Sequence, residues 1–144
     1  MKILIAPNAF KGTLGPLEAA RAIARAIEKL VPGAELELFP VSDGGDGLIE
    51  AFRFRGQGEL RTLSVPGPTW KPVRARWLLT GDTAIIEMAE AAGLKRLAGK
   101  RLAPLDAGTF GVGRLIRAAT RSGARSVIVG LGGSASNDGG AGCA

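Results

Sequence analysis

Three times along this chain, a short apolar segment runs into a loop of glycine and polar residues, and this pattern limits the possible folds more than any other feature. The apolar segments cover residues 2–6 (KILIA), 35–39 (ELELF) and 126–130 (SVIVG). The first two loops are each followed by a helical spacing of apolar residues, over 17–30 and 48–54. Strand, loop and helix in repeated succession is typical of a parallel α/β sheet.

The middle of the chain has a different character. Three strand-like runs follow one another there, at residues 59–65 (ELRTLSV), 73–79 (VRARWLL) and 83–88 (TAIIEM). Short turns separate them, which favours antiparallel pairing. We therefore expect an α/β fold in which a Rossmann-like parallel sheet with helices, built from residues 1–58 and 105–144, is interrupted by a β-rich insertion. The insertion covers residues 59–104 and begins a second domain.

Composition narrows the classes of protein. The chain has 144 residues, of which 46% are hydrophobic and 22% charged, the balance of a globular domain with a real core. No apolar run approaches the roughly 20 residues of a membrane helix. One cysteine excludes an internal disulfide, and the lack of histidine removes the usual zinc patterns. We expect a cytoplasmic protein with no membrane partner.

The net charge of +6 raises the question of nucleic-acid binding. Much of the excess lies late in the chain, where Arg114, Arg117 and Arg121 share one side of a predicted helix. Aromatic residues do not interleave with them, as a single-strand binder would require. We interpret the arginines as a solvated helix face, or as a basic surface near a site for anionic substrates, and expect no nucleic-acid partner.

The loop at residues 130–142 carries the strongest local signal for a binding site. Its small residues allow the backbone to approach an anion, so that consecutive N–H groups can bind phosphate or carboxylate oxygens. Ser134, Ser136 and Asn137 add neutral donors, and Asp138 adds a metal ligand or a base. A tight turn with helix-capping serines is the alternative. No lysine follows the glycines, so the loop is not a GxxxxGK[ST] P-loop, and the chain has no complete GxGxxG.

Two further loops carry charged groups. The SDGGDG loop at 42–47 places two aspartates around two glycines, which suits a divalent cation, a substrate hydroxyl or simply a turn that caps a helix. In the loop at 8–13, Lys11 can neutralise a phosphoryl group or be merely solvated. All three loops follow strands of an apparently parallel sheet, where open α/β sheets bind ligands. Together they offer the groups that phosphoryl transfer needs.

Several stretches of the chain resemble the glycerate kinase type-1 family, in the family's order. They are IAPNAFKGTL (5–14), SDGGDG (42–47), IIEMAEAAGL (85–94), TFGVGRLI (109–116) and GLGGSASNDGGAG (130–142). The resemblance implies transfer of the ATP γ-phosphoryl group to D-glycerate with Mg²⁺, giving 2-phosphoglycerate in the bacterial enzymes. It also implies a Rossmann-like domain with a second α/β domain inserted.

Within this resemblance, the loops supply candidate catalytic residues. Lys11 would offset charge on the transferring phosphoryl group, Asp138 would act as base or metal ligand, and Asp43 would hold Mg²⁺ or orient the substrate. The sequence does not rank Asp43 against Asp138. The predicted substrate- and phosphate-binding residues are Asn8, Gly44, Gly45, Gly132, Gly133, Ser134, Asn137, Gly139 and Gly140.

Members of the resembled family are much longer than this chain. We therefore expect the chain to be the N-terminal part of a longer kinase and to be inactive alone. The expected partners are small molecules, D-glycerate and ATP. The alternative hypothesis is a non-catalytic module that binds a nucleotide or another anion.

Overall fold

The computed structural model describes residues 1–56, 58–97 and 102–144. Its elements are, in order, β1 (Lys2–Ile5), α1 (Pro16–Leu30), β2 (Glu35–Leu38), α2 (Leu48–Arg55), β3 (Glu59–Pro66), β4 (Pro72–Thr80), β5 (Thr83–Glu87), α3 (Met88–Ala92), the 3₁₀ helix η1 (Leu94–Leu97), α4 (Phe110–Arg121) and β6 (Ser126–Gly130). The predicted α/β class is confirmed. Residues 98–101 of the predicted insertion lie outside the described residues.

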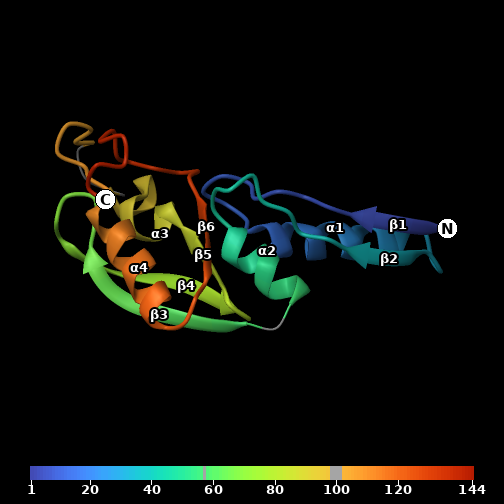
Figure 1. The fold of residues 1–144 in the computed structure, drawn as a ribbon. Helices are drawn as coiled ribbons and strands as arrows, with labels where there is room; N and C mark the ends of the chain where they lie inside the picture. Colours follow the sequence, from blue (N-terminus) through green and yellow to red (C-terminus); the bar gives the residue numbers. More distant parts are fainter. Residues whose placement is uncertain (57, 98–101) are drawn as a thin grey trace.

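The strands form two separate sheets (Figure 1). β1 and β2 pair in parallel, with Ile3 opposite Leu36. The second sheet has the order β3-β4-β5-β6. Its first three strands are antiparallel, as their short connections predicted.

The pairing of β6 differs from the arrangement that the sequence suggested. Residues 126–130 were expected to join the sheet of residues 1–58, but β6 pairs in parallel with β5, with Ile128 opposite Ile85. The reason is packing, because Val127 and Val129 lie against the core that β3, β4 and β5 share with α4. The division of the chain into domains stays a prediction, and residues 126–130 share a sheet with β3–β5.

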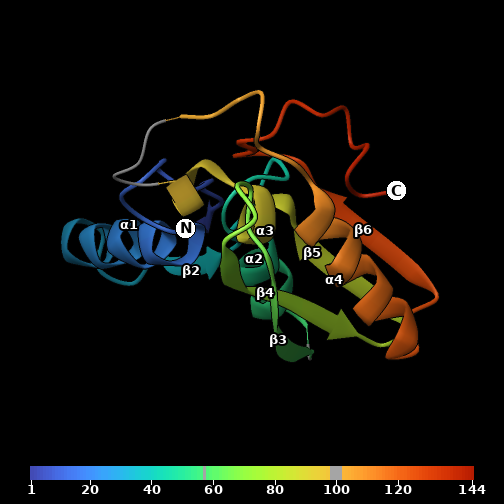
Figure 2. The same ribbon diagram turned by 90° about the vertical axis from the view of Figure 1, so that its left-hand side faces the viewer.

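Helices cover both faces of the four-stranded sheet (Figure 2). On one face, α4 buries Val112, Leu115 and Ala119 at the helical spacing predicted from the sequence. On the other face, α2 packs Leu48 and Ile49 against the side chains of β4 and β5. Since α2 follows β2 in the chain, its packing joins the two sheets.

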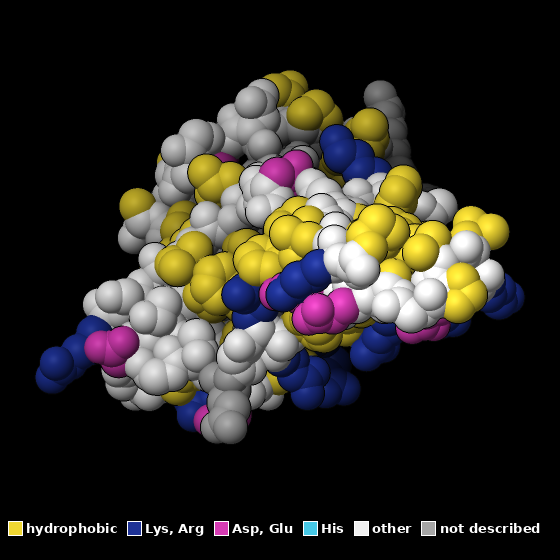
Figure 3. Space-filling view, turned by 90° about the vertical axis from the view of Figure 1, so that its right-hand side faces the viewer, with side chains coloured by type: hydrophobic (Ala, Val, Ile, Leu, Met, Phe, Trp, Pro, Cys, Tyr) yellow, Lys and Arg dark blue, Asp and Glu magenta, His cyan; other side chains and the backbone are white. Residues whose placement is uncertain are grey.

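The two-stranded sheet is covered by α1 on one face. Ile5 packs there against Ala20 and Ala24 of α1. Successive side chains of a strand point to opposite faces, so Leu4 points the other way, and it is 57% exposed. Figure 3, a view onto the right-hand side of Figure 1, shows hydrophobic side chains exposed among charged ones. Among the helices of the described ranges, none has the combined length and apolarity that crossing a membrane requires.

Two glycine loops make a direct backbone contact between α2 and the four-stranded sheet. The N–H of Gly132 donates to the carbonyl oxygen of Gly44 over 2.9 Å. A Cβ atom on Gly130 would collide with that same carbonyl oxygen, and one on Gly132 would collide with the Cα of Gly45. Only glycine permits so close an approach, so these residues are explained by packing before any ligand is considered.

This contact predicts a position-specific cost for adding one methyl group. Gly132→Ala should destabilise the chain by about 1–3 kcal/mol through overpacking, because the new Cβ meets backbone atoms that cannot rotate away. Gly56→Ala is the matched control, since a Cβ there lies 3.7 Å from the carbonyl oxygen of Phe52, an ordinary contact. Urea denaturation midpoints measure both. Equal midpoints for the two variants would contradict the described contact.

Candidate functional site

The loops after β1, β2 and β6 meet around residues 42–47. Next to the first loop, the carbonyl oxygen of Pro7 accepts the N–H of Val41 at 3.1 Å. At the end of the second loop, Gly47 packs so closely on the ring of Pro16 that a Cβ would collide with it. The third loop contributes the bond from Gly132 to Gly44. The 42–47 loop is thus linked to both ends of the first loop, through Pro7 and Pro16, and to the third loop through Gly132.

The 42–47 loop is a polar turn with an exposed carboxylate. Asp43 Oδ1 accepts the N–H of Gly45 at 3.1 Å, and Ser42 Oγ accepts the N–H of Gly44 at 3.2 Å. These bonds are local and leave the Asp43 side chain at the surface. Asp43 is therefore accessible to a ligand, whereas Gly44 and Gly45 have a packing role against Gly130 and Gly132.

The first loop places two predicted residues at the surface. Lys11 and Asn8 are both exposed. Asn8 Oδ1 accepts the N–H of the neighbouring Ala9 at 2.7 Å, which fixes its side chain locally. The Lys11 ammonium makes no ion pair within residues 1–56, 58–97 and 102–144. Its charge is therefore available to an anion in solution.

Glu87 is a site residue that the sequence reasoning missed. It ends β5, is 3% exposed, and its Oε1 accepts the N–H groups of Gly47 at 3.1 Å and Ile49 at 2.9 Å. These are donors of the first turn of α2, whose own N-cap residue, Gly47, has no side chain to supply a bond. Burial raises the pKa of Glu87, and the Ile49 N–H and the Lys95 ammonium oppose that rise.

Beside Glu87 lies a buried ionic cluster around Glu90, which is 2% exposed. Its carboxylate meets Arg76 at 3.1 Å, Arg96 at 3.0 Å and Lys95 at 3.0 Å. Burial alone would raise the pKa of Glu90, but the hydrogen bonds and charges of Arg76 and Lys95 outweigh it and lower the pKa to about 2. Lys95 also reaches Asp46 of the 42–47 loop at 2.8 Å. In the sequence, Glu87 and Glu90 lie within the otherwise apolar stretch at residues 85–92. This was the available signal of the cluster, because buried charges require partners.

The 130–142 loop has two halves with different contacts. Its first half is tied to the 42–47 loop and to α3, where Ala135 donates to the carbonyl oxygen of Ala92 at 2.8 Å. Ser134 Oγ accepts the N–H of Ser136 at 3.1 Å, which makes a local turn. The N–H of Leu94 donates to the carbonyl oxygen of Gly133 at 2.9 Å. The first half is thus held at several points by contacts within the chain.

In the second half, Asp138 is anchored to the start of α4. Its Oδ2 accepts the backbone N–H and the hydroxyl of Thr109, both at 2.8 Å, and the N–H of Gly142 at 3.1 Å. Its Oδ1 accepts the N–H of Gly140 at 3.1 Å. Burial raises the pKa of Asp138, but these four bonds outweigh it and lower the pKa to about 2. So acidic a group is a weak base at neutral pH, and the geometry favours anchoring over proton transfer.

The same half-loop leaves three consecutive amides available. The N–H groups of Asn137, Asp138 and Gly139 donate to no acceptor within the described part of the chain. Gly139 and Gly140 have positive φ values of 61° and 83°. Successive backbone N–H groups in a turn of this kind form concave anion sites. Of the predicted cradle, residues 137–139 therefore form the longest run of free donors, and the N–H groups of Gly133 and Ser134 also have no acceptor among the described residues.

No group of three or more acidic, cysteine or histidine side chains within the described ranges is arranged to hold a metal ion. Mg²⁺ commonly takes only one or two protein carboxylates together with substrate phosphates and water. The exposed Asp43 fits such a role better than Asp138, because four donors already occupy the Asp138 oxygens.

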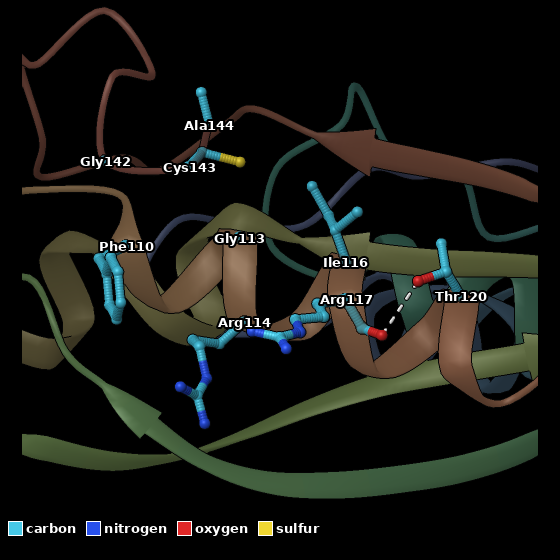
Figure 4. Close-up of a pocket in the computed structure, with 9 residues that line it drawn as sticks. All are labelled: Phe110, Gly113, Arg114, Ile116, Arg117, Thr120, Gly142, Cys143 and Ala144. Carbon is cyan, nitrogen blue, oxygen red and sulfur yellow. Dashed lines mark hydrogen bonds between the residues drawn. The ribbon is translucent and has the colours of Figure 1, made fainter.

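A cavity of about 390 Å³ lies elsewhere, between α4 and the end of the chain (Figure 4). Its lining includes Phe110, Arg114, Arg117 and Cys143, and none of the predicted site residues. The candidate site is therefore the loop cluster, because the predicted residues Lys11 and Asp43 lie there and none of the predicted site residues lines this cavity.

The Asp138 anchor predicts a pH-dependent loss of stability. The folded-state pKa is lowered from 3.8 to about 2, so the ionised carboxylate contributes its full stabilisation above pH 3.8, and this is lost as the pH falls through about 2. Asp138→Asn should cost about 1–3 kcal/mol at neutral pH, because one acceptor oxygen becomes a donor. Thermal unfolding of the unaltered chain and of Asp138→Asn should show the difference between their unfolding temperatures disappearing as the pH falls from 4 to 2.

Asp106→Asn is the control for this measurement, because Asp106 is exposed and its carboxylate forms no hydrogen bond or ion pair within the described ranges. It should unfold like the unaltered chain at every pH. If the difference in unfolding temperature between Asp138→Asn and the unaltered chain stays constant down to pH 2, the charge of Asp138 is not the source of the stabilisation.

Comparison with known proteins agrees with the loop pattern. The model of the glycerate kinase family matches residues 3–144. The chain is 46% identical to "Glycerate kinase" of Bacillus subtilis (strain 168) and 44% identical to "Glycerate 2-kinase" of Escherichia coli (strain K12), covering 99% of this chain and 38% of each relative. A crystal structure of "putative glycerate kinase 2" from Salmonella typhimurium LT2 matches with 41% identity and a TM-score of 0.79, over 99% of this chain and 39% of that one. The chain belongs to the glycerate kinase family.

Proposed function

We propose that this chain acts as part of an ATP-dependent kinase that phosphorylates D-glycerate to 2-phosphoglycerate. The observation that carries the proposal is that the 42–47 loop contacts the loops after β1 and β6, and that the three loops carry an exposed cation, an exposed carboxylate and amides without an acceptor among the described residues. The names of the relatives support glycerate as the acceptor, and "Glycerate 2-kinase" supports the 2-position. A cytoplasmic location, where ATP is available, belongs to the same proposal.

In this proposal, each loop has a distinct task. The amides of residues 137–139 bind phosphate or carboxylate oxygens, and Lys11 neutralises charge on the phosphoryl group. Asp43 holds Mg²⁺ or orients the glycerate hydroxyl. Mg²⁺, when bound, offsets the negative charge of the ATP phosphates. Asp138 keeps the amide turn in place through its bonds to Thr109, Gly140 and Gly142.

A second candidate is a non-catalytic module that binds a nucleotide or another anion. The free amides at 137–139 favour it, because they can bind an anion without any base or metal. The low pKa of Asp138 also points this way, since it weakens the base that the sequence suggested. Turnover separates the two candidates, because only the kinase consumes ATP in the presence of an acceptor.

The longest product of the gene that encodes this chain should phosphorylate D-glycerate with MgATP. ADP release measured against a panel of short hydroxy acids tests the acceptor, and ³¹P NMR of the product identifies the phosphorylated position. The 144-residue chain, assayed beside it, should show no turnover, because it spans only 38% of its curated relatives. Turnover on an unrelated acceptor without turnover on glycerate would refute the assignment.

The two aspartates should respond differently to removal of their charge. Asp43→Asn should lower kcat by about 10²-fold or more and be partly rescued by raised Mg²⁺ or by Mn²⁺, as expected for a ligand or orienting group. Asp138→Asn should chiefly lower the unfolding temperature, because its carboxylate anchors α4. Steady-state kinetics and thermal unfolding, measured on the same samples, compare the two variants. A larger kcat loss for Asp138→Asn in a stably folded protein would restore Asp138 as the base.

A further inference from the structure

Two side chains, Glu87 from the end of β5 and Lys95 from η1, hold the end of the 42–47 loop that leads into α2. Glu87 accepts the N–H groups of Gly47 at 3.1 Å and Ile49 at 2.9 Å, where the loop becomes α2. Lys95, at the start of η1, donates to Asp46 Oδ1 at 2.8 Å. Glu87 and Lys95 are themselves 3.7 Å apart. Both contacts link the loop to residues about 40 or more positions away in the chain.

The Lys95 contact is built to persist at neutral pH. Lys95 is surrounded by three carboxylates, from Asp46, Glu87 and Glu90. Burial lowers the pKa of Lys95, but its bonds to Asp46 and Glu90 outweigh this and raise the pKa, so the ammonium stays charged. Glu90 is in turn paired with Arg76 and Arg96, and these ion pairs attach the cluster to β4 and η1.

The contacts act on the end of the loop that leads into α2, three residues after Asp43. Asp43 has only a local bond, to Gly45, and so the loop backbone decides where its carboxylate lies. The loop is also held at Gly44, by the bond from the N–H of Gly132. Gly44 and Gly47 both have positive φ, at 91° and 93°, and frame the turn. Without Glu87 and Lys95, the 46–49 side of the turn loses its ties to the sheet.

We propose that Glu87 and Lys95 are positioning residues, which hold the 42–47 loop so that Asp43 lies correctly for the reaction. The proposal rests on the proposed kinase function. It assigns a task to Glu87, within the IIEMAEAAGL stretch, and to Lys95, which directly follows it. Neither residue needs to touch substrate, because each acts through the backbone or through Asp46. A misplacement of about 1 Å in a catalytic group is enough to cost 10²-fold in rate.

Hydrogen exchange in the 144-residue chain tests the clamp without any activity. Glu87→Ala should raise the exchange rates of the Gly47 and Ile49 amides by about tenfold or more relative to Ile86 in β5, since both lose their acceptor. Glu87→Gln keeps an acceptor oxygen and should retain most of the protection. The exposed Glu28→Ala is the control and should change neither amide. Unchanged exchange at Gly47 and Ile49 in Glu87→Ala would overturn the clamp.

Kinetics of the longest gene product tests the positioning. Lys95→Met should lower kcat about 10- to 100-fold and leave the KM for ATP within about twofold, and Lys95→Arg should recover most of the loss because it keeps the ion pair with Asp46. Lys71→Met, at an exposed lysine, is the control. A purely structural role predicts unchanged kcat in the folded variants, and that result would overturn the positioning.

The two experiments separate this inference from the proposed function. If the unaltered protein turns over no hydroxy acid, the kinase proposal fails, and with it the catalytic part of the inference, while exchange still decides the clamp. If Glu87→Ala does not fold, Glu87→Gln and Lys95→Met replace it. Faster Gly47 and Ile49 exchange in Lys95→Met than in Glu87→Gln then supports the clamp, and equal protection in all variants overturns it.

Discussion

Glu87 lies buried at the carboxyl end of β5 and accepts two amide hydrogens from the first turn of α2. A buried carboxylate is costly unless it is hydrogen-bonded, and the first amides of a helix are costly when they lack acceptors. The hydrogen bonds between the carboxylate and the amides therefore lower the free-energy cost of burying both. Because α2 follows β2 in the chain and packs on β5, this pairing also joins the β1–α1–β2 unit to the four-stranded sheet.

The same solution recurs at other helices. The N-cap positions of α1, α2 and α4 supply no capping side-chain bond of their own. Glu50 of α2 reaches the Leu17 N–H of α1 at 3.5 Å, and Asp138 of the glycine loop accepts the Thr109 N–H at the start of α4. Each of these three helices takes a cap from a distant element, so helix capping is also tertiary contact, although Glu18 of α1 also accepts the Gly15 N–H at 3.3 Å. Loss of one carboxylate should therefore loosen a junction as well as a helix end.

Local pattern predicted most elements, and tertiary packing decided the rest. The apolar spacing of α4 and the short turns between β3, β4 and β5 were sufficient for their prediction. The local pattern did not predict the partner of β6, because a five-residue apolar strand suits either sheet. Only the packing of β6 against α4 selects β5. At the site, the exposed Lys11 and Asp43 were readable as motif positions. The contacts of Asp138 with Thr109, 29 residues earlier, and of Glu87 with α2 depend on the fold and have no local signature.

Glycine in these loops serves two needs that a sequence motif does not distinguish. Gly130 and Gly132 are required by backbone contact with the 42–47 loop, whether or not a ligand binds. Gly139 and Gly140 make no such contact, and their positive φ values shape a turn with free amides. The amino end of α2 is already neutralised by Glu87, so it does not offer its dipole to an anion. In the proposed reaction, anion binding therefore falls to residues 137–139, and the cation or hydroxyl side falls to Asp43 of the 42–47 loop, because Asp46 is already paired with Lys95.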